Sequence, residues 1–420
     1  MLRQIDVKIT ALGALGDGVG EHEGVPVFVP GAAPGDLVSV DVDAPKKNGL
    51  YGTLRKIIEP GDARREPACT VFHKCGGCQL QYLADKPYEN WLTSRTEAAL
   101  AQQGLGDVAV AEPVITAPKS RRRVAFKALK AGKSLVLGFS KKQSHQIVDV
   151  TDCPITRTEI TDLIAPLRSV LTAILPNRKQ AELHLTVTAS GIDLLIDAPM
   201  ELDLAAREAL VDFANEQDIA AIHWRDQGFL DPVIIRRTPM MDLSGIRVPL
   251  APAAFIQATD EGETALVREV VAACKGAKRV VDLFAGIGTF TFPLAQNHQV
   301  LAVEGAKTAL EALQGGANFA SGLKQIIAKH RDLYRRPMTA KELSAFDAVV
   351  FDPPRAGAKE QALELAQSDV STIVAVSCNP NTFGRDARIL ADGGYNLKRV
   401  VPIDQFLWSP HIELVGVFEK

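Results

Sequence analysis

Hydrophobic and polar positions alternate in short runs near the start of the chain. The runs "VKITAL", "VPVFVP", "LVSVDV" and "YGTLRKII" are separated by turns such as "GDGVG" and "PGAAPGD". A period of two predicts half-buried strands, and several short strands joined by tight turns are typical of an all-β barrel. We therefore predict a small barrel over residues 1–58.

A charged stretch with two prolines, "EPGDARREPAC", ends this pattern and predicts a linker. Residues 87–103 then have the pattern of a helix with an early proline. The segments "VITAPKSRRRVAFKALKAGKSLVLGFS", "ELHLTVTASGIDLLID" and "AAIHWRD" have the pattern of strands. This mixture predicts a central α/β domain over residues 59–250.

From residue 251 the pattern changes to continuous apolar runs, each followed by a loop rich in glycine, proline or acidic residues. The runs are "RVVDLFAGIGTF", "VLAVEG", "FDAVVFDPPR" and "STIVAVSCNP". Strands buried on both faces of a parallel sheet require such runs. The last two segments, "YNLKRVVPIDQF" and "HIELVGVFEK", leave no room for a helix and predict an antiparallel hairpin. Four parallel strands closed by a hairpin resemble the class I S-adenosylmethionine-dependent methyltransferase fold, so we expect this domain over residues 251–420.

The predicted barrel also carries a resemblance. The segment "LGDGVGEHEGVPVFVPGAAPGDLVSVDV" resembles a TRAM domain, in which a glycine-rich turn, a Val-Pro strand end and a Pro-Gly-Asp turn come in this order. TRAM domains have an OB-like fold and are attached to RNA-modifying enzymes. The resemblance therefore implies an RNA anchor.

Length and composition limit the class of protein. A chain of 420 residues is too long for one compact core, so two or three domains are expected. No apolar run approaches 18 residues, and the first residues lack the apolar core of a secretory signal. We expect a cytoplasmic, monomeric protein with no membrane partner. The net charge of −3 argues against a chain that coats nucleic acid everywhere, and we expect no DNA partner.

One segment is nevertheless strongly basic. Residues 119–142 contain nine lysines and arginines and no acidic residue. Such a run is often only a solvated surface. The lack of acids and the interleaved Phe126 and Phe139 favour contact with RNA phosphates and stacking on bases. The predicted substrate contacts are Arg121, Arg122, Arg123 and Lys127.

A nucleotide-like ligand is indicated by "DLFAGIGTF", residues 282–290. Its glycines let backbone approach a ligand and lead into a helix N-terminus, although a tight turn without a ligand has the same pattern. Glu304 ends the next apolar run, where a carboxylate can accept two ribose hydroxyl bonds. Asp332 lies near the expected end of the third strand and could receive an adenine amino group. No third glycine for a pyrophosphate follows, so adenosine without phosphates fits better than NAD.

A reactive thiol is indicated after a later strand of the same predicted sheet. Asp352 follows the fourth-strand run in the rigid loop "FDPPRAG", and Cys378 follows the fifth. Both should lie at the carboxyl edge, where open α/β sheets bind ligands. A cysteine beside a strand is often only a small buried apolar residue, and we interpret Cys274 in "VVAACKG" that way. The polar run after Cys378 predicts a nucleophile instead, and we expect Arg385 to favour its thiolate.

These residues resemble a known family. "FIQ", "DLFAGIGTF", "FDPPRAG", "SCNPNTFGRD" and a terminal "HIE" occur in the order of the RNA uracil-C5 methyltransferases. The resemblance implies that Cys378 adds to C6 of uracil, that C5 takes a methyl group from S-adenosylmethionine, and that Glu413 then removes the C5 proton, with His411 as support. It also implies that Asp352 forms a hydrogen bond with the polar edge of the uracil base. The cofactor-binding residues that it implies are Gln257, Phe284, Thr289, Glu304, Asp332 and Asp352.

Four of the six cysteines predict a metal centre. "CTVFHKCGGC" contains Cys69, Cys75 and Cys78, and Cys153 follows at a distance in "TDCPI". In a reducing compartment grouped cysteines hold metal or do chemistry more often than they form disulfides. Four thiolates suit zinc and an iron–sulfur cluster equally. The CGGC pattern resembles a branch of the same family that carries a [4Fe-4S] cluster, which implies these four cysteines as its ligands.

The sequence does not decide which RNA is the substrate, and it leaves two alternative functions open. The cluster-bearing branch implies 23S ribosomal RNA, with transfer RNA as the other possibility. An RNA cytosine-C5 methyltransferase also uses a cysteine after the fifth strand, but it normally has a second cysteine where this chain has "DPPR". A non-catalytic RNA-binding scaffold would leave Cys378 and Glu413 together as coincidence.

Overall fold

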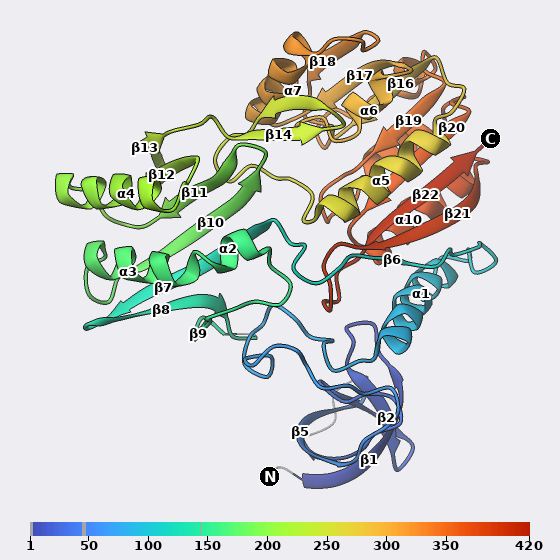
Figure 1. Ribbon diagram of the computed structural model, residues 1–420. Helices are drawn as coiled ribbons and strands as arrows, with labels where there is room; N and C mark the ends of the chain where they lie inside the picture. The colour runs from blue at the N-terminus through green and yellow to red at the C-terminus, as the bar shows by residue number, and fades with distance from the viewer. Residues whose placement is uncertain (1–2, 44–47, 143) are drawn as a thin grey trace.

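The computed structural model describes residues 3–43, 48–142 and 144–420. Figure 1 shows three parts: a barrel at the N-terminal end, a central sheet with helices on one side, and a large sheet between two helical layers. In none of the described ranges is a helix both long and apolar enough to span a bilayer.

The N-terminal part is a closed barrel with the strand order β1-β2-β3-β5-β4. Its strands are β1 (Arg3–Leu12), β2 (Gly18–His22), β3 (Val25–Val29), β4 (Leu37–Val42) and β5 (Leu50–Glu59). Alternate residues such as Ile5, Val7 and Ile9 point inward and form the barrel core. The predicted barrel is confirmed. It has one strand more than expected, because the glycine-rich β2 has no apolar alternation.

The central part is a seven-stranded sheet with the order β13-β12-β11-β10-β7-β8-β9. Its strands are β7 (Arg123–Ala131), β8 (Ser134–Ser140), β9 (Ile147–Asp149), β10 (Gln180–Thr188), β11 (Gly191–Asp197), β12 (Ala221–Asp226) and β13 (Phe229–Ile235). Its helices are α2 (Thr158–Thr161), α3 (Ile164–Ile174) and α4 (Leu204–Glu216). Leu171 of α3 and Leu210 of α4 pack with Phe126 on one face of the sheet. Because strand side chains alternate between faces, Arg123 and Lys127 lie on the opposite face.

The large sheet has the order β18-β17-β16-β19-β20-β22-β21-β6. Five strands are parallel: β16 (Arg279–Leu283), β17 (Gln299–Glu304), β18 (Ile326–His330), β19 (Ala348–Phe351) and β20 (Thr372–Ser377). The hairpin of β21 (Asn396–Asp404) and β22 (Glu413–Glu419) closes it in antiparallel fashion. Its helices are α5 (Asp260–Ala273), α6 (Thr291–Ala295), α7 (Lys307–Phe319), α8 (Ala340–Leu343), α9 (Lys359–Ala366) and α10 (Pro380–Asp392). The expected methyltransferase fold is therefore confirmed.

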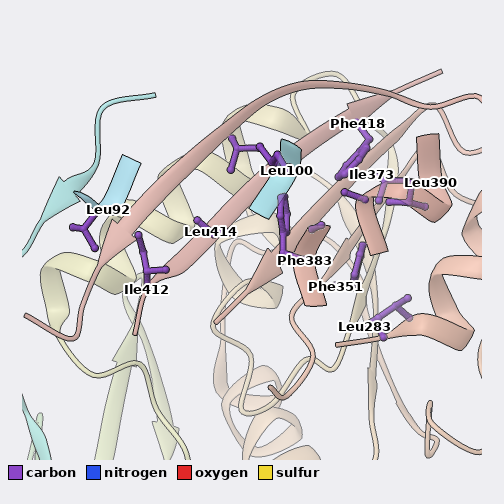
Figure 2. Close-up of a cluster of buried hydrophobic side chains, with 14 of the residues drawn as sticks. Leu92, Leu100, Leu283, Phe351, Ile373, Phe383, Leu390, Ile412, Leu414 and Phe418 are labelled. Atoms are coloured by element: carbon purple, nitrogen blue, oxygen red, sulfur yellow. The ribbon is translucent and has the colours of Figure 1, made fainter. Parts of the chain in front are cut away.

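Three earlier segments of the chain also pack against or pair with the large sheet and its helices. Helix α1 (Asp85–Ala101) places Leu92 and Leu100 beside Phe383 and Ile412 (Figure 2), and β6 (Val114–Ile115) pairs with β21. Each fully buried leucine contributes about 1.5–3 kcal/mol of transfer free energy. The hairpin of β14 (Met240–Leu243) and β15 (Ile246–Pro249) packs against α7. The predicted boundaries at 58 and 250 left all three segments in the central domain, whereas they pack on the large sheet or on its helix α7.

Candidate active site

The side chains predicted for the site meet at one edge of the large sheet. Parallel strands end at the same edge, and the residues at or just after the ends of β16, β17, β19 and β20 are Phe284, Glu304, Asp352 and Cys378. Strand β22 runs the other way and pairs its Leu414 with Ser377 at the end of β20. Glu413, the first residue of β22, therefore lies at that edge too.

The glycine turn after β16 borders the expected adenosine site. Glu304 Oε2 accepts a hydrogen bond of 2.8 Å from the Gly286 backbone N–H. Phe284 has a φ of +61°, which turns the chain at the strand end, and its ring centroid lies 5.5 Å from that of Tyr334. The Tyr334 N–H donates to Asp332 Oδ1 at 3.0 Å. Tyr334 was not predicted, and its only signal in the sequence is an aromatic residue two positions after Asp332.

Three carboxyl groups make this region suitable for a cation. Asp282 is fully buried, and its Oδ2 accepts a bond of 2.6 Å from Thr291 Oγ1, whereas its Oδ1 has no partner among the described residues. Burial, together with the nearby charges of Asp352 and Glu304, raises the pKa of Asp282 to about 7. S-adenosylmethionine carries a sulfonium and an ammonium group, so the donor set fits it. Thr289, also predicted here, is half-buried in the same turn.

The affinity for S-adenosylmethionine is expected to rise with pH. Burial raises the pKa of Asp352 to about 7, so its carboxyl group is neutral below pH 7 and negative above it. Binding that requires the charged form should strengthen about tenfold between pH 6 and pH 8. Isothermal titration calorimetry between pH 6 and pH 8 measures the affinity for S-adenosylmethionine. S-adenosylhomocysteine, which lacks the sulfonium charge, and the Asp352→Asn variant should show a flatter profile. Equal pH dependence for both ligands would contradict the assignment.

The side chains of Gln257 and Gln405 form hydrogen bonds that position the carboxyl groups of Asp352 and Glu413. Gln405 Nε2 donates to Gln257 Oε1 at 2.6 Å, and Gln257 Nε2 lies 3.4 Å from Asp352 Oδ2. The Gln405 side chain also bonds to Glu413. Burial and the negative charge of Asp352 raise the pKa of Glu413 well above its usual value, which makes its carboxylate a stronger base. Gln405 was missed, and its only signal is a polar residue between two apolar strands.

The Cys378 thiol is half-buried between β20 and Asn379, the N-cap residue of α10. Burial, together with the charges of Glu413 and Asp352, raises the pKa of this thiol to about 12. Arg355 opposes it. The expectation for Arg385 needs correction, because this side chain is paired with Asp386 at 2.7 Å and the structure gives the neighbouring positive charge to Arg355.

His411 lies beside the same arginine. Arg355 Nη2 is 2.7 Å from His411 Nδ1. Burial and the positive charges of Arg355, Arg95 and Arg121 lower the pKa of His411 to about 4. The imidazole is therefore neutral at physiological pH and can accept a hydrogen bond from Arg355. Arg355 and His411 together link the loop after β19 to the start of β22.

The basic segment divides between the surface and the interior. Arg123 and Lys127 lie on the open face of the central sheet, and the Arg123 guanidinium stands 5.7 Å from the ring centroid of Phe255. Phe255 is 64% exposed. A positive charge beside an exposed aromatic ring is the combination that phosphate contact and base stacking require.

Two expectations about this segment are wrong. Arg122 is only 3% exposed, and its guanidinium is paired with Asp260 and with Glu263 at 2.6 Å, so it braces α5 and is not available to RNA. Phe126 is fully buried and packs against Phe139 with ring centroids 4.9 Å apart. Phe126 fills the core and cannot stack on bases, whereas Phe139 is partly buried and lines the cavity of the four cysteines. Arg121 lies inward with its guanidinium over the Phe406 ring at 5.7 Å.

The four cysteines predicted as metal ligands line one cavity of about 310 Å³. They are Cys69, Cys75, Cys78 and Cys153, and all are free thiols. Burial, with smaller effects from the other three thiols, raises the pKa of Cys78 to about 12. Among the residues that the structure describes, no three side chains of suitable type converge tightly enough for a single metal ion. Cys274 is buried at the end of α5, as expected of a small apolar residue.

Fold and site together define a class I S-adenosylmethionine-dependent methyltransferase joined to a TRAM barrel. The TRAM domain family matches residues 3–54, and the tRNA (Uracil-5-)-methyltransferase family matches residues 249–420. An uncharacterized RNA methyltransferase of Brucella suis is 42% identical over 414 residues, 99% of this chain and 97% of that protein. The 23S rRNA (uracil(1939)-C(5))-methyltransferase RlmD of Shewanella amazonensis is 30% identical over 435 residues, 99% and 96% of the two chains. The chain belongs to the RNA uracil-C5 methyltransferase family and is an S-adenosylmethionine-dependent enzyme acting on RNA.

A solved structure has the same fold over the whole length. The tRNA (uracil-54, C5)-methyltransferase of Pyrococcus abyssi in complex with S-adenosyl-L-homocysteine superposes with a TM-score of 0.78, covering 99% of this chain and 100% of that one at 22% identity.

Membership of the RNA uracil-C5 methyltransferase family excludes the two alternative functions that the sequence left open, the non-catalytic scaffold and the cytosine-C5 enzyme.

Proposed function

We propose that this enzyme methylates C5 of a specific uridine in 23S ribosomal RNA through a covalent adduct on Cys378. The observation that carries the proposal is the convergence of a thiol, Cys378, with the partly buried Asp352 and the buried Glu413 at one sheet edge. A nucleophile and a strong base beside one another are what a reaction at an unreactive ring carbon requires.

The first step is addition of the Cys378 sulfur to C6 of the uracil. Because the pKa of the thiol is near 12, its proton must leave as the S–C6 bond forms. Asp352, with its pKa near 7, is an available acceptor at neutral pH. The addition turns C5 into a carbon nucleophile, which takes the methyl group of S-adenosylmethionine and releases S-adenosylhomocysteine.

The second step restores the ring. The Glu413 carboxylate removes the proton from C5, the C5–C6 double bond forms again, and the S–C6 bond breaks. Cys378 recovers its proton from Asp352, and Glu413 releases the C5 proton to solvent. The raised pKa of Glu413 increases its strength as a base in this step. Atoms and charges therefore balance over one turnover, with one methyl group gained and one proton released.

The choice of 23S ribosomal RNA rests on likeness over the full length of the chain. The relative that acts on 23S rRNA is 30% identical across almost all of both chains. Likeness to the Pyrococcus abyssi transfer-RNA enzyme rests on the fold. We propose that the barrel, Arg123, Lys127 and Phe255 contact the RNA that flanks the flipped uridine. We further propose a monomer in the cytoplasm, where reducing conditions keep the cysteines as thiols.

Mass-spectrometric mapping of modified uridines tests this target. Total RNA from cells with and without the gene is digested and compared, and one 5-methyluridine in 23S rRNA is expected to disappear with the gene. A plasmid with the wild-type gene should restore it, and one encoding Cys378→Ala should not. Loss of a transfer-RNA modification with unchanged 23S rRNA would overturn the target.

For the cysteine-lined cavity we propose a [4Fe-4S] cluster. Four thiols around about 310 Å³ fit the ligand set, whereas a lone zinc ion needs its sulfurs about 2.3 Å from one point. The cluster would be held by Cys69, Cys75, Cys78 and Cys153, and the proposed methyl transfer requires no electron from it.

Purification without air is expected to yield brown protein with about four irons per chain, as a [4Fe-4S] cluster requires. The Cys75→Ser variant should lose colour and iron because it removes a ligand. Cys378→Ala is the matched control, since it removes a thiol elsewhere and should keep both. Elemental analysis measures the iron and zinc content of each protein, and an absorption spectrum measures its colour. Colourless protein that contains zinc and no iron would contradict the cluster.

A further inference from the structure

The cysteine-lined cavity shares a wall with the catalytic loop. Residues 405–412 join β21 to Glu413, and we name them the bridging loop. Four of its residues line the same cavity as the cysteines: Phe406, Leu407, Ser409 and His411. Any group that fills this cavity is therefore packed directly against the loop.

The segment that follows Cys78 also fixes the bridging loop by its backbone. The N–H groups of Gln79 and Leu80 both donate to the Trp408 carbonyl oxygen, at 2.8 Å and 3.0 Å. The Arg65 guanidinium stands 5.1 Å from the Trp408 ring centroid, and Arg65 Nε donates to the Gln81 carbonyl at 3.1 Å. The cysteine segment and Trp408 thus form one connected unit.

Trp408 has a backbone conformation that needs such support. Its φ is +59°, which is rare for a bulky side chain. The Trp408 N–H donates to Tyr88 Oη at 2.9 Å, and Tyr88 Oη donates to Asp404 Oδ2 at 2.8 Å. Contacts from the cysteine segment on one side and from α1 on the other therefore hold this turn in place.

The far end of the bridging loop reaches the reacting groups. His411 contacts Arg355, whose charge acts on Cys378, and Glu413 follows His411 by two residues. The Gln405 side chain, at the other end of the loop, bonds to Glu413. A shift of the loop would therefore move the base and the positive charge beside the thiol together.

We propose that the bridging loop is a positioning element that couples the group held by the four cysteines to the catalytic geometry of Cys378 and Glu413. Filling the cavity fixes Phe406 to His411, and through them the base. Loss of the group releases the loop and lowers kcat, with little effect on RNA affinity. The proposal rests on the roles proposed above for Cys378 and Glu413.

The first test changes the contact between the two segments and leaves the cysteines intact. Arg65→Met removes the guanidinium from the Trp408 ring. Hydrogen–deuterium exchange of peptides covering residues 405–413 should rise about fivefold, as expected from loss of a partly exposed cation–π contact. The kcat should fall with an unchanged KM for RNA. Asp85→Asn is the matched control, because Asp85 pairs with Arg65 at 2.6 Å but is exposed, and it should change neither quantity.

The second test removes the group itself. Protein treated with an iron chelator should show the same rise in exchange over residues 405–413 and the same fall in kcat, with full binding of RNA in a filter assay. Unchanged exchange in this segment with a lower RNA affinity would overturn the proposal and give the group a role in RNA binding. Unchanged exchange in Arg65→Met would overturn it as well. Exchange reports the loop independently of chemistry, so failure of the Cys378 and Glu413 roles would be distinguished by the covalent-adduct assay.

Discussion

Replacing Glu413 by glutamine is expected to leave methylated RNA covalently attached to the enzyme. The amide keeps the size of the side chain and a hydrogen bond with Gln405, but it cannot take the C5 proton. Addition and methyl transfer proceed, whereas release of Cys378 stops. Turnover should fall about 10²–10⁴-fold, the usual contribution of a positioned base. With tritiated S-adenosylmethionine, the label should migrate with the protein on a denaturing gel.

The double variant Cys378→Ala with Glu413→Gln is the control for this result, since it removes the sulfur that forms the adduct. No label should remain with its protein band. Mass spectrometry of the single variant should locate the nucleotide on the peptide that contains Cys378. A Glu413→Gln enzyme that turns over at the wild-type rate would show that another group removes the proton.

Replacing Cys378 by alanine should have the second large effect. Without the sulfur, C5 of uracil is too poor a nucleophile to take the methyl group, and kcat should fall by more than about 10⁴-fold. Binding of S-adenosylmethionine, measured by isothermal titration, should be retained because the proposed adenosine site is at the ends of β16 and β17, away from Cys378 at the end of β20.

Cys274→Ala provides the matched control for the loss of a thiol. This side chain is buried at the end of α5, so the variant should lose about 1 kcal/mol of stability and keep its activity. If Cys378→Ala methylated RNA at a rate within tenfold of the wild type, the covalent mechanism would be wrong.

Much of the fold could be predicted because its strongest signals are local. Apolar runs such as "STIVAVSCNP" report strands buried on both faces, and the short spacing before the last strand reports a hairpin. The attachment of β6 to β21, whose paired residues are 289 positions apart in the chain, has no such signal. Residues 114 and 115 fall in a segment with a strand pattern, but pairing between distant segments depends on tertiary packing, which the pattern does not report.

The site shows the same division. Asp352 and Cys378 could be placed together because both follow strands that end at one edge. Gln405, Arg355 and Tyr334 contribute through contacts between separate loops, which spacing cannot show. The error at Arg122 had a usable signal, because alternation along the strand separates it from Arg123 and the lysine at 127. A count of charges along the chain does not say which face each side chain occupies.

Release of tritium from RNA that carries [5-³H]uridine tests the central claim most directly. Methylation at C5 must expel the hydrogen at that carbon, so purified enzyme with S-adenosylmethionine and 23S rRNA should release one tritium for each methyl group transferred. Glu413→Gln should transfer methyl groups without this release. Transfer of methyl groups by the wild-type enzyme with all tritium retained in the RNA would contradict the account.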